Sequence, residues 1–333
     1  MSPLTQFETR EPREEEHGAH IIEVMRRRQQ KPYPPGGTLR DAHTKQTALL
    51  EAEFVVGPDV PDDLRVGLFA APASYRALVR FSNSSDSPHP DGDKDLRGVA
   101  IKLRGVPGER IAESDEADTQ DFILMHAPAM PLGTVKLFHD AIYLVTERSP
   151  ILFALKMLLT GHLKVLLGLR KVQVNPSSPL DVRYWSTTPY LFGPDRVAKY
   201  SLVPTPERTS AGPSSPPPPD YLTRAVQVHL GQADATFDFM VQIRTDPATM
   251  PVEDAAVRWN EKAAPFAKVA TLRIPMQGFD PERAAALAQS LAFSPAHALV
   301  EHRPIGAINR VRMRVYDEQA RWRQRRDGVE RIA

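Results

Sequence analysis

The chain has 333 residues, of which 41% are hydrophobic and 25% are charged, the composition of an ordinary globular protein. Its 42 Lys and Arg residues against 41 Asp and Glu residues give a net charge of +1, so we expect no nucleic-acid partner. The absence of cysteine excludes disulfides, thiol nucleophiles, zinc–thiolate sites and iron–sulfur clusters. A redox metal would therefore have to be held by His, Tyr, carboxylate or Met side chains.

The N-terminal part of the chain, residues 1–38, has the character of a charged arm. It contains a short amphipathic helix over Ala19–Arg28, followed by a turn-rich stretch. Residues 1–18 are acidic and polar and contain no apolar stretch typical of a secretion signal, so we expect a cytoplasmic protein. We predict one domain over residues 39–326 and a short tail over residues 327–333.

Apolar and β-branched runs predict a series of strands. These runs are Ala48–Val56, Ala77–Ser82, Val99–Arg104, Asp121–Met125, Tyr200–Val203, Ala225–Leu230, Phe237–Arg244 and Val269–Ile274. A loop rich in Pro and Ser, Thr205–Pro219, lies between two of them. Helical periodicity runs from Val135 to about Gly168, from Pro281 onward, and through a very basic segment at Ile308–Arg326. Together these elements predict an α+β protein built on an antiparallel β-barrel or sheet.

One stretch, Ile151–Leu169, has the hydrophobicity of a membrane segment, but Lys156 and Lys164 interrupt it. A lysine near the middle of a bilayer costs about 2.5–3.5 kcal/mol, which disfavours a spanning helix. We interpret the stretch as a buried or surface-lying pair of amphipathic helices with a break at Thr160–Gly161. Contact of this pair with a lipid surface is the alternative.

The sequence contains no Gly-rich phosphate loop, no HExxH motif and no nucleophile elbow. Four other places carry residues suited to chemistry. They are Arg40–His43 before the first strand, Val79–Ser82 in the second, Asp121–His126 at the end of a buried strand, and Arg312–Tyr316 with Arg323 in the C-terminal helix. Considered alone, His43 could equally be a surface residue or a buried histidine with ordinary hydrogen bonds. Arg80 could equally be an arginine at the rim of a sheet.

The fourth place has a definite geometry. Arg312 and Tyr316 are four residues apart, so they lie one turn apart on one helix face, and Arg323 two turns on shares that face. A guanidinium beside a phenol stabilises the phenolate and lowers the pKa of the phenol. The same pattern also fits an exposed basic helix that happens to contain a tyrosine.

Together these places resemble the haem catalase family. That family carries R-x-x-H before a barrel strand, an RFS strand, an RG-x-A-x-K strand and R-x-x-x-Y on a C-terminal helix. Here the motifs stand in that order at Arg40–His43, Arg80–Ser82, Arg97–Lys102 and Arg312–Tyr316. The blocks TQDFILMHAP, RYWSTTPYLFG, AFSPAHALVEHRPIGAINR and VRMRVYDEQARWR resemble the short catalase-related subfamily, and the resemblance extends from about Leu39 to Arg323.

The resemblance implies a haem b buried in an antiparallel barrel. Tyr316 would be the axial iron ligand through its phenolate, and Arg312 would keep that phenolate ionised. His43 would be the acid–base group on the opposite face, oriented by Ser82; it would move a proton from the near oxygen of a peroxide to the far one. Three further positions match family arginines that pair with the haem propionates: Arg40, Arg80 and Arg323.

The chain departs from the family where peroxide is positioned. His126 stands where the family usually has an Asn that helps to place peroxide, so we include His126 among the catalytic candidates and expect weak dismutation of hydrogen peroxide. Met125 precedes it, and the segment after Pro128 reads AMPLG where the family has aromatic residues, which implies a different, roomier pocket.

Three functions follow from the resemblance. The first is a haem peroxidase-like oxidoreductase that reduces hydrogen peroxide or organic hydroperoxides with an electron donor. The second is a fatty-acid hydroperoxide isomerase or lyase of the allene oxide synthase type, which the apolar Ile151–Leu169 and the altered pocket favour. The third is a non-catalytic haem-binding protein, for which a second acid–base group such as His43 would be unnecessary. We expect a homodimer.

Overall fold

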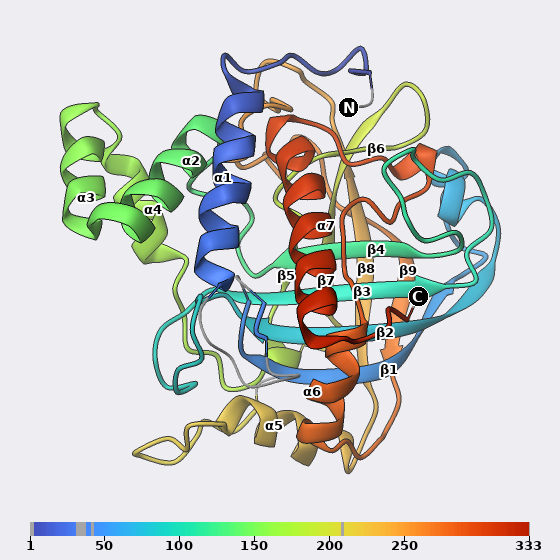
Figure 1. The fold of residues 1–333 in the computed structure, drawn as a ribbon. Coiled ribbons are helices and arrows are strands. Elements are labelled where there is room, and N and C mark those ends of the chain that lie inside the picture. Colours follow the sequence, from blue (N-terminus) through green and yellow to red (C-terminus); the bar gives the residue numbers. More distant parts are fainter. Residues whose placement is uncertain (1–2, 31–37, 41–42, 208–209, 333) are drawn as a thin grey trace.

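A closed antiparallel β-barrel forms the centre of the molecule (Figure 1). The computed structural model describes residues 3–30, 38–40, 43–207 and 210–332. The strands follow the order β5-β4-β3-β2-β1-β9-β8-β7, the pairing of β5 with β7 closes the ring, and β6 pairs with β7 as an additional strand. All of these pairings are antiparallel. The strands are β1 Gln46–Val56, β2 Ala73–Asn83, β3 Arg97–Arg104, β4 Gln120–Met125, β5 Tyr184–Trp185, β6 Tyr190–Leu191, β7 Val197–Pro204, β8 Ala235–Ile243 and β9 Ala267–Ile274. The predicted α+β architecture with an antiparallel barrel is confirmed.

Aromatic side chains fill the interior of the barrel. In β8, Phe237 and Phe239 are fully buried, because alternate residues of a strand point to the same face. The ring of Phe239 lies 4.6 Å from that of Phe122 and 5.1 Å from that of Phe54, measured between centroids. The barrel interior is therefore a packed core, which holds the wall strands in a fixed register.

The helices lie outside the barrel. They are α1 Glu14–Gln29, α2 Val135–Tyr143, α3 Pro150–Leu159, α4 Leu163–Lys171, α5 Tyr221–Leu230, α6 Pro281–Ser290 and α7 Ala307–Asp327, and a π-helical turn, Leu144–Arg148, joins α2 to α3. In Figure 1, α1 and α7 run side by side across one face of the barrel, and α3 and α4 project away from it. Ile21 and Met25 of α1 belong to the same apolar cluster as Val311 and Val315 of α7. The domain boundaries at residues 38 and 326 stay predictions.

The predicted strand Ala225–Leu230 is wrong, because these residues form the second half of α5. The alternation of Val226, Val228 and Leu230 favours a strand when it is considered alone. In the structure Val226 and Leu230 are fully buried, as is Leu222, whereas Val228 is 63% exposed. Positions four residues apart share one helix face, so the burial follows the helical period. The other predicted strands and helices are present, with boundaries that differ by a few residues.

The predicted helix pair in the apolar stretch is confirmed as α3 and α4. The break falls at Thr160–Gly161, where Gly161 adopts a φ of +76°, a conformation that favours glycine. No helix in the described ranges combines the length and the hydrophobicity needed to cross a bilayer. Two strands, β5 and β6, have two residues each and were not predicted, since such short elements carry no periodicity.

Candidate functional site

A cavity lies against the outer face of the barrel, between strands β2–β4 and helices α1 and α7. It has two connected parts, and the side chains of His43 and Tyr316 line both. The first part, which we call the arginine end, has a volume of about 100 Å³ and includes Arg40, Arg80 and Arg323 in its wall. The second part, the apolar end, has a volume of about 380 Å³ and extends towards α2 and α4. The resemblance implied a cofactor within the barrel; the space for one lies against its outer wall, because the interior is packed.

His43 is held in place from three sides. Its backbone N–H donates to the carbonyl of Ser84 at 3.1 Å, and its own carbonyl accepts from the Arg80 guanidinium at 2.7 Å. Its ring Nδ1 lies 3.0 Å from the hydroxyl of Ser82. The backbone φ of 56° lies in the left-handed region, which is unusual for histidine. These contacts together hold a sparsely populated conformation and point the imidazole along the wall of the cavity.

The environment of His43 keeps its imidazole neutral. Burial lowers the pKa of His43 to about 4, and the positive charge of Arg80 contributes in the same direction. At neutral pH this imidazole can therefore accept a proton.

Gly98 makes room for the His43 ring. In the pairing of β2 with β3, Gly98 lies opposite Ser82, which contacts the imidazole. A Cβ atom at position 98 would lie 2.4 Å from Cε1 and 2.7 Å from Nδ1 of His43. Such distances are far inside van der Waals contact, so only glycine at this position admits the imidazole. Gly98 belongs to the Arg97–Lys102 motif, but the sequence alone indicates no role for this glycine.

Three guanidinium groups gather at the arginine end. Arg323 donates to the carbonyl of Leu291 at 3.0 Å, and Arg40 donates to the same carbonyl at 3.1 Å. Arg80 donates to the side-chain oxygen of Gln46 at 3.1 Å. Among the residues that the structure describes, none of the three arginines has a carboxylate within ion-pair distance, and Nε of Arg323 is buried without a hydrogen-bond partner.

The positive charges at the arginine end of the cavity favour the binding of an anion. Burial, and then the positive charge of the neighbouring arginines, lowers the pKa of Arg40 and Arg323 well below the usual value and lowers the pKa of Arg80 to about 10. Three neighbouring like charges without a carboxylate partner among the described residues are costly, and a ligand that carries carboxylates would offset that cost.

Arg312 and Tyr316 form the pair that their spacing predicts. The guanidinium carbon of Arg312 lies 5.5 Å from the centroid of the Tyr316 ring. Arg312 also donates to Thr188 at 3.0 Å and to the side chain of Asn309 at 3.2 Å, which fixes its plane. Burial alone would lower the pKa of Arg312, but the phenols of Tyr316 and Tyr190 raise it. The charged guanidinium is thus held beside the phenol that faces the cavity.

The structure does not bring His126 to the cavity. Nδ1 of His126 accepts a hydrogen bond from the backbone N–H of Arg97 at 2.9 Å, and the side chain is absent from the walls of both parts of the cavity. Met125, its neighbour, does line the apolar end. The remaining sequence-predicted site residues, which are Arg40, His43, Arg80, Ser82, Arg312, Tyr316 and Arg323, all line the cavity.

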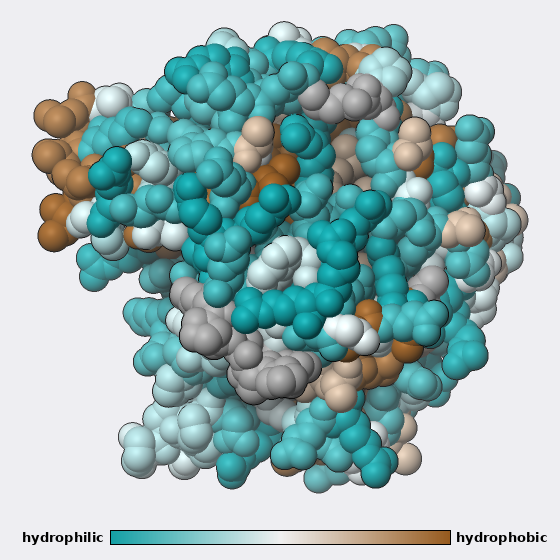
Figure 2. Space-filling view, in the orientation of Figure 1, coloured by the Kyte–Doolittle hydropathy of each residue, from teal (hydrophilic) through white to brown (hydrophobic). Residues whose placement is uncertain are grey.

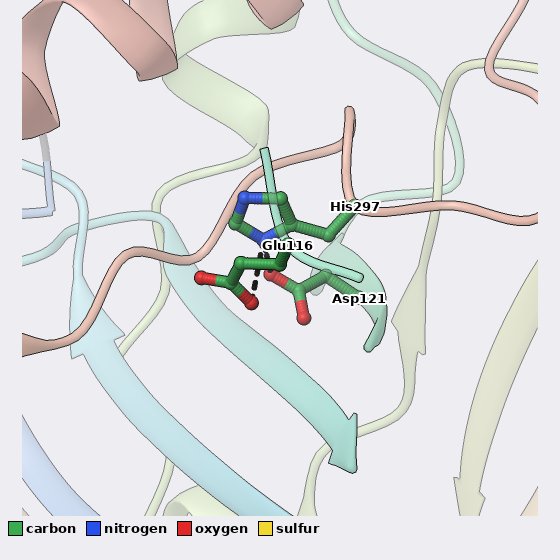
Figure 3. A group of neighbouring side chains, drawn as sticks. All are labelled: Glu116, Asp121 and His297. Carbon is green, nitrogen blue, oxygen red and sulfur yellow. Dashed lines mark hydrogen bonds and ion pairs between the residues drawn. The ribbon is translucent and has the colours of Figure 1, made fainter. Parts of the chain in front are cut away.

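A second buried cluster of charged residues lies near the start of β4 and was not predicted as a site. Glu116, Asp121 and His297 approach one another closely enough to suggest a metal site (Figure 3). The Lys102 ammonium, however, lies 3.1 Å from an oxygen of Asp121 and 3.2 Å from Nδ1 of His297, and it also pairs with Glu116. The Lys102 ammonium occupies the position that a metal ion would take among these three residues. Arg331 binds Glu116 from the outside at 2.8 Å. The cluster is therefore a structural ion-pair network.

Solved structures with the same fold are catalases. A fungal catalase matches with a TM-score of 0.63 and 17% identity over 91% of this chain and 62% of its own. Catalase A from Saccharomyces cerevisiae matches with a TM-score of 0.68 and 14% identity over 91% of this chain and 64% of its own. A bacterial catalase matches with a TM-score of 0.66 and 16% identity over 92% of this chain and 60% of its own. The chain thus spans 60–64% of the length of these catalases. No family model and no curated protein matches the sequence. The chain has a catalase-like fold, and the short catalase-related subfamily stays a prediction.

Proposed function

We propose that the protein binds haem b in this cavity and reduces hydrogen peroxide or organic hydroperoxides with electrons from a donor, with weak catalase activity. The observation that carries the proposal is the arrangement of charges around one cavity. Three arginines that have no carboxylate partner among the described residues lie at one end, and Tyr316 and a neutral His43 line both parts. The catalase-like fold supports the same assignment.

The residues of the cavity fit a haem. Arg40, Arg80 and Arg323 would hold the two propionates, since guanidinium groups recognise carboxylates with paired hydrogen bonds. Apolar side chains from the strands and helices would cover the faces of the macrocycle: Met25, Ala100, Ile123, Phe293 and Val315. Tyr316 offers a phenol oxygen for the iron, and the Arg312 guanidinium lies over the ring of this phenol. When bound, the haem iron supplies the redox chemistry that cleaves a peroxide bond.

Proton transfer in the proposed reaction is assigned to His43, which Ser82 and Arg80 hold in position. With Nδ1 engaged by Ser82, the imidazole of His43 keeps Nε2 for proton exchange. We assign to His43 the transfer of the peroxide proton from one oxygen to the other, which turns the departing oxygen into water or an alcohol. Such a positioned acid–base group contributes about 10²–10⁴-fold to the rate. Ser82 orients the ring, and Arg80 fixes it through the backbone carbonyl.

The wall beside His43 favours organic over inorganic peroxide. The cavity-lining residues of β3 and β4 are all apolar: Gly98, Val99, Ala100, Ile123, Leu124 and Met125. Because His126 points elsewhere, this part of the wall presents no side-chain amide or second imidazole to position the small, polar hydrogen peroxide. We therefore assign weak dismutation and faster turnover of alkyl hydroperoxides.

The test begins with haem binding. After incubation with hemin and removal of the excess, the protein should show a Soret band with the high-spin ferric features of a tyrosinate-ligated haem. Tyr316→Phe removes the phenol oxygen and should shift or abolish this spectrum, whereas Tyr143→Phe, outside the cavity, should leave it unchanged. An unaltered spectrum in Tyr316→Phe would show that another residue binds the iron.

The volume of the apolar end favours a second candidate, the rearrangement of a fatty-acid hydroperoxide. Side chains of Met130, Leu132, Val135, Phe138 and Ile142 line this end, which suits an acyl chain. Product analysis with a lipid hydroperoxide separates the two candidates. A hydroxy fatty acid formed with consumption of the electron donor supports reduction, and an allene oxide formed with release of water supports rearrangement. A haem-loaded protein that turns over neither cumene hydroperoxide nor hydrogen peroxide would leave only haem binding.

A further inference from the structure

Helices α3 and α4 form a hairpin that is covered by protein on one side only. Phe153, Met157 and Val165 are buried and pack with Leu132 and Ala141. Figure 1 shows that the rest of the hairpin stands away from the barrel. The inner face of the hairpin thus packs against the rest of the molecule, whereas its outer face is not covered by the described residues.

The outer face is strongly apolar. Within the described part of the chain, twelve large hydrophobic side chains are exposed, and eight of them lie between Val145 and Leu167. We call this set the outer hairpin face: Val145, Ile151, Leu152, Leu155, Leu158, Leu159, Leu163 and Leu167. Ile151 and Leu159 are 77% and 78% exposed. Figure 2 shows the corresponding hydrophobic patch over the projecting helices, while the surface around it is mostly hydrophilic. A contiguous apolar patch of this kind marks an interaction surface.

Around the outer hairpin face the charges without an ion-pair partner among the described residues are positive, and the nearby Glu147 pairs with Arg27 at 3.0 Å. Lys164, Arg170 and Lys171 are exposed and have no ion-pair partner among the described residues. Residues 149–172 contain no Asp or Glu. Lys156 is different, since it pairs with Asp140 at 2.8 Å and so ties the hairpin to α2.

We propose that the outer hairpin face docks the protein on the surface of an anionic lipid bilayer. Apolar side chains would enter the interface between headgroups and acyl chains, and Lys164, Arg170 and Lys171 would contact the negative headgroups. A second copy of this chain fits less well, because two such faces brought together would oppose cations, and the nearby Glu147 is already paired with Arg27. Neither helix spans the bilayer; the hairpin lies on it.

Docking would place the cavity beside the membrane. Leu169 at the end of α4 and Val172 after it line the apolar end of the cavity. A bilayer on the hairpin would therefore lie next to the part of the cavity suited to an acyl chain, and an apolar hydroperoxide would reach it from the lipid. This consequence rests on the proposed haem function, whereas the docking itself does not.

Vesicle flotation tests the docking without any need for haem. The full chain is mixed with vesicles of phosphatidylcholine alone, or with about 30% phosphatidylglycerol added. We expect flotation with the anionic vesicles, weaker flotation with phosphatidylcholine, and a marked decrease in about 0.5 M NaCl, where the screening length falls to roughly 4 Å.

Two pairs of variants separate the apolar and the electrostatic contributions. Ile151→Ser with Leu159→Ser should weaken partition by about tenfold or more, and Val228→Ser, an exposed apolar residue on α5, serves as the control. Lys164→Gln with Lys171→Gln should weaken partition roughly fivefold for each cation. Its control is Lys94→Gln with Lys262→Gln, which changes the net charge equally at exposed positions outside the hairpin.

Three results would overturn the proposal. The first is the absence of flotation with anionic vesicles at low salt, and the second is flotation of the hairpin variants equal to that of the wild type. The third is concentration-dependent dimerisation in light scattering that Ile151→Ser with Leu159→Ser abolishes, since a second copy would then be the occupant. Because flotation is measured by protein position in the gradient, a failure of the haem proposal would leave both readouts unaffected.

Discussion

Gly98→Ala is the most direct test of how the barrel positions its acid–base group. The added Cβ atom would lie 2.4 Å from Cε1 of His43, and ordinary contacts begin at 3.4 Å, so the ring has to move by about 1 Å. Movement of that size breaks the 3.0 Å contact between Nδ1 and Ser82. The backbone of Gly98 does not lie in the left-handed region, so alanine introduces no backbone strain of its own.

The expected effect is large on the rate and small on the fold. A misplacement of 1 Å in a reacting group costs roughly 10²-fold. Overpacking of one methyl group costs about 1–3 kcal/mol of stability, which a domain of this size tolerates. We therefore expect the peroxidase rate per bound haem to fall about 10²-fold while thermal unfolding stays cooperative.

Stopped-flow measurement of the peroxide reaction, normalised to haem content, provides the assay. Gly278→Ala is the matched control, since a Cβ atom there meets nothing within 4 Å. A double-mutant cycle adds the decisive comparison: in a His43→Ala background, Gly98→Ala should have little further effect, because the group it displaces is gone. A rate within about twofold of the wild type, or an equal loss in both backgrounds, would refute the positioning of His43 by the glycine.

Three further outcomes follow from the same site. His43→Ala should retain haem and slow the peroxide reaction by about 10²–10⁴-fold, and equal rates in rapid-mixing experiments would exclude the acid–base role. Arg323→Met should weaken haem binding roughly 10–100-fold in a hemin titration. The same substitution should change the unfolding free energy of the haem-free protein by less than about 1 kcal/mol, because loss of the hydrogen bond to the Leu291 carbonyl is offset by removal of a buried charge. The pKa of His43 is about 4 in the folded state and near 6.5 when unfolded, so the unfolded chain binds more protons between these values. Stability should therefore fall as the pH decreases from about 6.5 towards 4, and His43→Gln should flatten that slope in denaturant titrations; an unchanged slope would show that other groups dominate.

The sequence by itself determined the features that depend on residues close together in the chain. The alternation in Phe237–Arg244 predicts a strand, and the structure contains it as β8, Ala235–Ile243. The spacing of Arg312 and Tyr316 places them one turn apart on a helix, and their side chains do face each other. The break at Thr160–Gly161 is also predictable from neighbouring residues, because a glycine interrupts an otherwise helical pattern of apolar residues. Local periods of two and 3.6 residues carry this information.

The tertiary structure alone decided what the long-range pairings bring together. Gly98 contacts the His43 ring only because the register of β2 and β3 sets it opposite Ser82. His126 directly follows Met125, which lines the apolar end of the cavity, yet the ring of His126 accepts a hydrogen bond from the backbone N–H of Arg97. Val228 is exposed because α5 presents its other face to the barrel, which its local alternation does not reveal. Which side chains share a cavity is fixed by strand register and helix orientation, and these depend on contacts between residues far apart in the sequence.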